Sequence, residues 1–323
     1  MLRRTLLAAA CCLPALRPAL AAGWSPDRPL RLIVPFAAGG PADIFGRLFA
    51  EALSRQLGQP VVIENRTGAG GLVGTEAVAR AAPDGLTLGF TGPGALSIAP
   101  AMPQQRMPFD VERDLAHLTL VVRVPEVLVV NAASGPANLK ALIAKAKARP
   151  GEMSYGSAGA GSLTHLASAL FASAAGIEAL HVPYRGAAPA ATDLLAGRFD
   201  FMTADVPVLR PHIEAGALRP LAVTTAQRVA ALPEVPTTAE LGLPQVNSDN
   251  WYGLALPAAT PAPIREALRA AALKALRDPA LVQEFAKQGG ESSPMEPEAY
   301  LDFLRREAAK WGPIVRSTGA EAL

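Results

Sequence analysis

Cysteine is nearly absent from this chain of 323 residues, and its only two copies, Cys11 and Cys12, lie close to the N-terminus. Residues 1–22 begin with a basic pair, continue with a short apolar stretch and end in the small-x-small sequence Ala19-Leu20-Ala21. This is the pattern of a secretory signal peptide, with cleavage expected near residues 21–23. The exported chain would then carry no cysteine, which excludes disulfides, thiol catalysis and cysteine metal sites.

An N-terminal membrane anchor that stays attached is the alternative for residues 1–22. The apolar stretch is short and is interrupted by Pro14 and Pro18, which disfavours a membrane span. No apolar run of membrane length follows residue 22. We therefore predict an exported protein without an integral membrane segment once the signal peptide is removed.

Aromatic residues are also scarce, at 5% of the chain, and there are only four histidines. Removing residues 1–22 removes three arginines and no acid, so the formal net charge changes from +2 to about −1. Sparse aromatics and a near-neutral charge argue against nucleic-acid binding. No pair of histidines has the spacing of metal ligands on one face, and we predict neither a metal nor a cofactor.

What the chain does have is a regular alternation of apolar runs and amphipathic segments, which predicts an α/β fold with mostly parallel sheets. The first unit has strands at 30–36, 60–65 and 86–90 and helices near 43–57 and 71–82. The second unit follows an apolar run at 121–131. It has strands at 153–157, 179–184, 199–205, 218–225 and 250–257, and helices near 138–148, 162–175, 188–196 and 206–215.

Two amphipathic helices, near 261–287 and 297–317, finish the chain with no strand predicted between them. The simplest explanation is that the chain returns to cover its first unit. We therefore predict two lobes, the first from 23–124 plus 253–323 and the second from 125–252. Crossover segments would lie near 121–130 and 250–256; one continuous sheet is the alternative.

Glycine-rich sequence stands at two junctions between a strand and a helix, at 37–43 and 68–71. A helix start leaves backbone N–H groups unpaired, and the helix dipole there favours negative charge. Two such junctions on one edge would hold a small anion without a buried cation. The alternative for the first junction is a tight turn whose helix is capped by Asp43.

A dinucleotide site is disfavoured at these junctions. The glycines at 68, 70 and 74 miss the G-x-G-x-x-G spacing by one residue, and the strand at 86–90 ends without the acid that would bind a ribose hydroxyl. No P-loop lysine follows either turn.

A third glycine junction spans 157–165, where Ser162 is a candidate helix cap and His165 falls in the first helical turn. A hydrolase would need a serine paired with His165, but Tyr155 stands where a nucleophile elbow needs its first glycine. We predict no catalytic residue. Asp205, at the end of an apolar strand, either binds a ligand amine or a water, or caps the helix that begins at Val206.

Long stretches of the chain resemble the substrate-binding proteins of tripartite tricarboxylate transporters, also called Bug proteins. The resemblance rests on RPLRLIVPFAAGGPADIFGRLFAEALSRQLGQPVVIENRTGAGGLVGTEAVARAAPDGLTLGF, HVPYRGAAPAATDLLAGRFDFM, LPEVPTTAELGLP and NWYGLALPAATP. It implies a two-lobe receptor outside the cytoplasm that closes around a small carboxylate, such as a di- or tricarboxylate, an acidic amino acid or an aromatic acid. It also implies a periplasmic monomer that delivers its ligand to membrane permease subunits; an exported sensor is the alternative.

The resemblance also implies the binding residues, with the carboxylate held mainly by backbone groups and ordered waters. In the first lobe they are Phe36, Ala38, Gly40, Asp43, Asn65, Gly70 and Gly71, and in the second lobe Ser157, Gly159 and His165. Asp205 joins them as a candidate, in a stretch, TADVPVL, that departs from the commoner family pattern.

Overall fold

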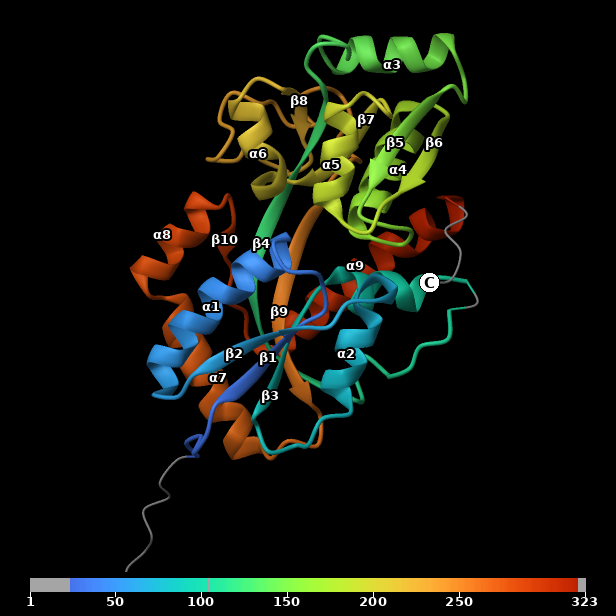
Figure 1. Ribbon diagram of the computed structural model, residues 1–323. Coiled ribbons are helices and arrows are strands. Elements are labelled where there is room, and N and C mark those ends of the chain that lie inside the picture. Colours follow the sequence, from blue (N-terminus) through green and yellow to red (C-terminus); the bar gives the residue numbers. More distant parts are fainter. Residues whose placement is uncertain (1–23, 104, 319–323) are drawn as a thin grey trace, which may run out of the picture.

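The fold is that of a computed structural model, in which residues 24–103 and 105–318 are described. The predicted signal peptide lies outside the described residues. Ten strands are linked by hydrogen bonds in the order β2-β1-β3-β9-β4-β7-β5-β6, with β10 and β8 also paired to β4. Helices cover both faces of this arrangement, which is the predicted α/β fold (Figure 1).

The first group of strands starts with three parallel neighbours, to which antiparallel strands are added. β1 pairs in parallel with β2 and β3, β9 runs antiparallel to β3 and β4, and the short β10 runs antiparallel to β4. The bounds are β1 Leu30–Val34, β2 Val61–Asn65, β3 Thr87–Thr91, β4 Leu115–Asn131, β9 Asp249–Pro257 and β10 Glu291–Ser292.

The second group repeats this plan at the far end of β4. β5 pairs in parallel with β6 and β7, while β7 and β8 both run antiparallel to β4. The bounds are β5 Met153–Ser157, β6 Ala179–Pro183, β7 Phe201–Asp205 and β8 Leu218–Val223.

β4 is the strand that joins the two groups, because its first part pairs with β9 and β10 and its last part with β7 and β8. Hydrogen bonding is therefore continuous through β4, as the single-sheet alternative required. The parallel strands nevertheless form two separate units, one at each end of β4 (Figure 1). The molecule has the two-lobe architecture, and the residue bounds of the lobes stay a prediction.

Each group of strands is packed between helices. Around the first group are α1 Pro41–Leu57, α2 Leu72–Ala79, α7 Ala262–Leu276, α8 Pro279–Lys287 and α9 Pro297–Thr318, with short turns η1 Ala69–Gly71, η2 Gly94–Ile98 and η3 Ala99–Ala101. Around the second group are α3 Leu139–Ala148, α4 Leu163–Ala175, α5 Ala187–Leu195 and α6 Val206–Glu214.

Apolar faces at helical spacing explain how these helices pack. Phe45, Phe49 and Leu53 of α1 are fully buried, in one core with Phe285 of α8. Gly58 ends α1 in the left-handed conformation, at φ 67°, as its position predicted. α9 reaches the second group, where Trp311 packs with Leu166 of α4.

The structure corrects the predicted elements at three places. α1 begins at Pro41 with Gly40 as its N-cap, so Asp43 is not the cap. The helix predicted over 261–287 is two helices, because Asp278 caps a new helix start at Pro279. The last two predicted helices are separated by β10, a strand too short to show a periodic pattern.

Candidate ligand-binding site

The strand register makes the carboxyl ends of the two parallel units face each other. At the end of β3, Thr91 pairs with Gly253 of β9, which pairs with Leu120 of β4. At the end of β7, Asp205 pairs with Glu126 of β4, and β7 runs along β4 in the opposite sense to β3. The two ends are therefore separated by about 20 Å of strand, the rise of six residues. Ligands of open α/β sheets bind outside such carboxyl ends.

The loop after β1 is organised by Asp43, which lies in the first turn of α1 and is 4% exposed. Its carboxylate accepts hydrogen bonds from the Gly39 N–H at 3.0 Å, Asn65 Nδ2 at 3.0 Å and Arg47 Nε at 2.9 Å. Burial acts to raise the pKa of Asp43, but the bonds from Arg47, Gly39 and Asn65 outweigh it and hold the pKa below its ordinary value. The Asp43 carboxylate therefore already accepts hydrogen bonds from protein donors.

Free hydrogen-bond donors lie beside Asp43 in the same loop. Ala37 and Ala38 are exposed, and their N–H groups have no partner among the described residues. The Gly40 N–H makes only a long bond, 3.5 Å, to the Ala37 carbonyl. These donors lie just before the N-terminus of α1, whose dipole also favours an anion.

The loop after β2 supports the first loop. Asn65 Nδ2 donates to the Phe36 carbonyl at 3.0 Å as well as to Asp43, so it ties the two loops together. Gly71 lies against the Phe36 ring, where an added Cβ would stand 3.3 Å from Cζ. The predicted first-lobe residues are thus brought together, but the Asn65 side-chain amide is hydrogen-bonded to protein groups.

Gly70 and Gly71 have positive φ, 60° and 101°, which glycine adopts without strain. The Gly71 N–H donates to the Gly68 carbonyl at 3.0 Å. The Gly70 carbonyl lies against Gly94 of η2, so that a Cβ on Gly94 would be 2.3 Å from it. The loops after β1, β2 and β3 are therefore packed against one another.

In the second unit, the junction after β5 is built on two histidines, the buried His165 and the partly buried His181. Ser157 Oγ lies 2.6 Å from His181 Nε2 and 3.1 Å from the Gly159 carbonyl. The Gly161 N–H donates to His165 Nδ1 at 3.2 Å, and the rings of His165 and His181 stack with centroids 3.8 Å apart. Burial lowers the pKa of both histidines to about 4, helped at His165 by repulsion from His181. Both rings are neutral at pH 7.

Ser162 caps α4 as predicted, since its Oγ accepts a hydrogen bond from the His165 N–H at 3.3 Å. The serine whose hydroxyl contacts an imidazole is Ser157, and its partner is His181 rather than His165. No side-chain carboxylate is hydrogen-bonded to either imidazole within residues 24–103 and 105–318. His181 was missed because it stands in a strand, with no motif to mark it.

Asp205 lies at the other face of the site, at the N-cap position of α6, but its side chain makes no cap hydrogen bond. The capping alternative is therefore wrong. Oδ2 instead accepts from Asn250 Nδ2 at 3.2 Å, and the same nitrogen donates to the Tyr252 hydroxyl at 3.0 Å. The Tyr252 ring meets the Phe36 ring edge-on at 6.5 Å. A chain of contacts thus connects Asp205 to the first loop.

Glu126, on β4, is the functional candidate that the sequence did not reveal. It is fully buried directly opposite Asp205, and its Oε2 accepts from Ser248 Oγ. Glu126 Oε1 and Asp205 Oδ1 are buried without a hydrogen-bond partner among the described residues. Burial raises the pKa of both groups, and repulsion from Asp205 adds to the effect at Glu126. A lone acid in the apolar run VVRVPEVLVVN was the available signal.

Comparison with known proteins shows the family of this chain. The model of the tripartite tricarboxylate transporter family receptor, TctC, matches residues 45–320. This chain belongs to that family. Protein BugT of Bordetella pertussis is 38% identical to this TctC-family chain over 301 residues, which is 92% of the chain and 91% of BugT.

Solved structures show the same architecture as this TctC-family receptor. A protein of R. palustris solved with adipate has a TM-score of 0.87 at 33% identity, covering 92% of this chain and 99% of its own. MatC from Rhodopseudomonas palustris, solved with malate, has a TM-score of 0.82 at 29% identity, covering 90% and 99%. The resemblance seen in the sequence is thereby confirmed.

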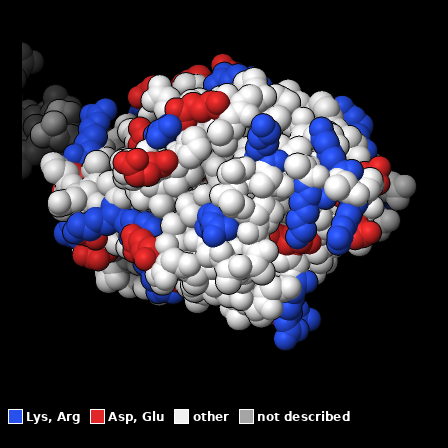
Figure 2. All heavy atoms as spheres, turned by 90° about the horizontal axis from the view of Figure 1, so that it is seen from above, with Lys and Arg blue, Asp and Glu red and all other residues white. Residues whose placement is uncertain are grey.

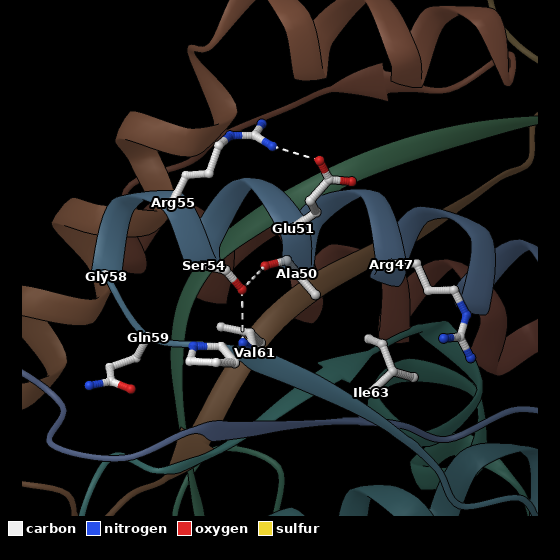
Figure 3. A pocket seen from close by; sticks show the side chains of 10 residues that line it. Arg47, Ala50, Glu51, Ser54, Arg55, Gly58, Gln59, Val61 and Ile63 are labelled. Carbon is white, nitrogen blue, oxygen red and sulfur yellow. Dashed lines mark hydrogen bonds and ion pairs between the residues drawn. The ribbon is translucent and has the colours of Figure 1, made fainter.

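A pocket of about 670 Å³ lies elsewhere on the TctC-family chain, between α1 and β2 (Figure 3). Ser54 accepts there from the Val61 N–H and donates to the Ala50 carbonyl, and Arg55 pairs with Glu51. Gly58, Gln59 and Pro60 are among its lining residues, which places it toward the amino end of β2. Of the residues that organise the candidate site, it includes only Arg47. The candidate site is therefore located by the strand ends and not by this pocket.

Charged side chains of both signs are interspersed over the end of the molecule seen from above (Figure 2). Across the described ranges, no group of three or more histidines, cysteines or acids could hold a metal ion. Among the helices that the structure describes, none has the length and apolarity that a membrane span requires.

Proposed function

We propose that this TctC-family chain is a periplasmic receptor that captures a small organic acid between its two lobes and delivers it to a permease. The proposal rests mainly on the backbone N–H groups of two exposed residues, Ala37 and Ala38, which have no partner among the described residues and follow the end of β1. They lie at a helix N-terminus, where a carboxylate is stabilised without a cation in direct contact.

The relatives support a carboxylate as ligand, since two similar structures hold adipate and malate. Phe36, Ala38 and Gly40 would form the first wall, with Asp43 and Asn65 holding that wall in shape. Gly70 and Gly71 would complete it. Ser157, Gly159 and His165 would approach from the second lobe, where neutral imidazoles and hydroxyls donate hydrogen bonds without adding charge.

Ligand capture would be a population shift toward a closed form, because only that form brings both walls against the ligand. β4 and β9 are the strands along which the two units move relative to each other. Export by the signal peptide 1–22 would place the receptor in the periplasm as a monomer. The ligand is bound and released without chemical change.

A thermal-shift assay against small organic acids tests the proposal. Adipate, malate, succinate and L-aspartate would be compared with their dimethyl esters, which keep the shape but lose the negative charge. At 100 times its Kd, a true ligand stabilises the folded state by about 2.7 kcal/mol. At least one acid should raise Tm while its ester does not. Equal behaviour of every acid and ester would overturn the carboxylate assignment.

A further inference from the structure

Two buried carboxyl groups face each other where β7 ends on β4. Asp205 and Glu126 are a directly paired residue couple on antiparallel strands, 3% and 0% exposed. Side chains at such positions share one face, with Cβ atoms about 5 Å apart. Each carboxyl has one oxygen bound to a neutral partner, Asn250 Nδ2 or Ser248 Oγ, and one oxygen with no partner among the described residues.

The charged groups near Asp205 and Glu126 do not neutralise the negative charge of these two acids. Asp249 of β9 is a third acid nearby, and it is already paired with Arg123. Lys310 of α9 pairs with Glu307. Tyr252 is neutral, since burial and the two carboxyls raise its pKa well above the ordinary value. No cation is hydrogen-bonded to Asp205 or Glu126 within the part of the chain that the structure describes.

Two carboxylates this close and this deeply buried do not both ionise. Burial raises the pKa of both groups, and repulsion from Asp205 raises that of Glu126 further, so the couple retains a proton at neutral pH. A cation that enters the site replaces that proton and gains two charged acceptors. The site is therefore selective for a positive group and unfavourable for a second ligand carboxylate.

We propose that the Asp205–Glu126 couple binds the protonated amine of the ligand, and that the ligand is a small amino acid with an additional carboxylate. This inference rests on the proposed receptor function. An ammonium group offers three donors, which suit Asp205 Oδ1, Glu126 Oε1 and a further oxygen. The contacts from Asp205 through Asn250 and Tyr252 to Phe36 connect this subsite to the loop that holds the carboxylate.

A metal ion or a plain dicarboxylate would fit the Asp205–Glu126 couple less well than an amine. A metal ion would need a third ligating side chain, and no such group of three occurs among the residues described. A plain dicarboxylate would bring negative charge toward two acids. An amine satisfies both free oxygens and releases the shared proton to solvent.

Isothermal titration of the full-length exported receptor tests this subsite. L-aspartate and L-glutamate are compared with succinate and glutarate, which have the same carbon chains without the amine, in phosphate and in Tris at pH 7.5. The amino acids should bind at least 10-fold more tightly than the amine-free acids. Binding of L-aspartate or L-glutamate should release between half a proton and one proton. This release would appear as a difference in binding enthalpy between phosphate and Tris.

Asp205→Asn and Glu126→Gln should each abolish both the preference and the proton release. Either variant retains the size of the side chain, and far-UV circular dichroism verifies folding. Asp302→Asn, which removes an exposed carboxylate on α9, is the matched control and should behave as the unaltered receptor.

The outcomes separate this inference from the proposed function. Equal or tighter binding of succinate or glutarate overturns the amine subsite and leaves the carboxylate receptor standing. Retention of the amine preference in both Asp205→Asn and Glu126→Gln also overturns the subsite. Failure of all four acids to bind, together with adipate and malate, would overturn the receptor proposal itself.

Discussion

Asp43, in the first turn of α1, and Asp205, at the end of β7, are both buried acids on the ligand side of the sheets, yet their pKa values shift in opposite directions. Asp43 receives hydrogen bonds from a backbone N–H, an amide and a guanidinium, and its pKa is lowered despite burial. Burial raises the pKa of Asp205, and its one hydrogen bond, from Asn250, does not offset that effect. Burial acts in the same direction on both acids, and the number of hydrogen-bond donors decides whether it is outweighed.

From this difference we infer different roles for Asp43 and Asp205 in the site. A carboxylate whose partners are all protein groups fixes a loop, and Asp43 holds the loop that presents the free N–H groups. A carboxyl whose oxygens lack partners remains available, and Asp205 with Glu126 can receive a cation. The predictions that follow, from the largest expected effect to the smallest, would sharpen or break this distinction.

Asp43→Ala should have the largest effect, a loss of about 3 kcal/mol in the free energy of unfolding, because it removes the acceptor for three donors. Ligand affinity should fall more than 10-fold as the first loop loses its support. Urea unfolding and calorimetry measure the two effects. Glu51→Ala, at an exposed site on the same helix, is the control and should cost less than about 0.5 kcal/mol. Unchanged affinity in Asp43→Ala would remove the first loop from the site.

Glu126→Gln should stabilise the protein at pH 8 by on the order of 2 kcal/mol, and have little effect at pH 4. The pKa of Glu126 is raised to about 8 in the folded state, so the folded protein binds more protons than the unfolded chain between pH 4.5 and 8. Its contribution to stability is complete below pH 4.5 and is lost as pH rises through 8. Urea unfolding at both pH values measures the difference. A destabilised variant at pH 8 would show that Glu126 is compensated after all.

Between pH 7 and pH 4, the free energy of unfolding of His181→Gln should fall by about 1 kcal/mol less than that of the unaltered receptor. The pKa of His181 is lowered to about 4, so the unfolded chain binds more protons than the folded protein between pH 6.5 and 4. Stability is therefore complete above pH 6.5 and is lost as pH falls through 4. His212→Gln, at the end of α6 and outside the stacked pair, is the control. Identical acid sensitivity in the two variants would contradict a neutral stacked pair.

Arg47→Gln should have the smallest effect, at most about 1 kcal/mol, because 55% of the Arg47 side chain is exposed and solvent screens its charge. Gly39 and Asn65 would still donate to Asp43, so the first loop should keep its shape. Affinity for the ligand should change less than 3-fold in calorimetry. A loss as large as that of Asp43→Ala would mean that Arg47 itself contacts the ligand.

The order of strands and helices could be predicted from the sequence because it rests on local periodicity and on caps. Gly58 and Ser162 ended and began their helices where expected. The prediction missed the helix break at Asp278–Pro279, although an acid before proline is a common helix start. The early start of β4 at Leu115 could not be predicted from local sequence, because pairing with β9 sets it.

The candidate site was less predictable than the fold. Glycine junctions indicated which segments approach the ligand edge, but not which groups there are occupied. Asp43 could be placed near the site, whereas its bonds to Arg47 and Asn65 depend on side chains that meet only in the folded chain. Glu126 and His181 became visible only through the partners across their strands, 79 residues away for Asp205 and 24 for Ser157.

The most direct test is a crystal structure of the receptor with the ligand that it retains when purified from the periplasm. Our account predicts a carboxylate within 3.2 Å of the Ala37 or Ala38 N–H, between the ends of β1 to β3 and β5 to β7. A ligand bound in the pocket between α1 and β2, with those N–H groups facing only water, would contradict it.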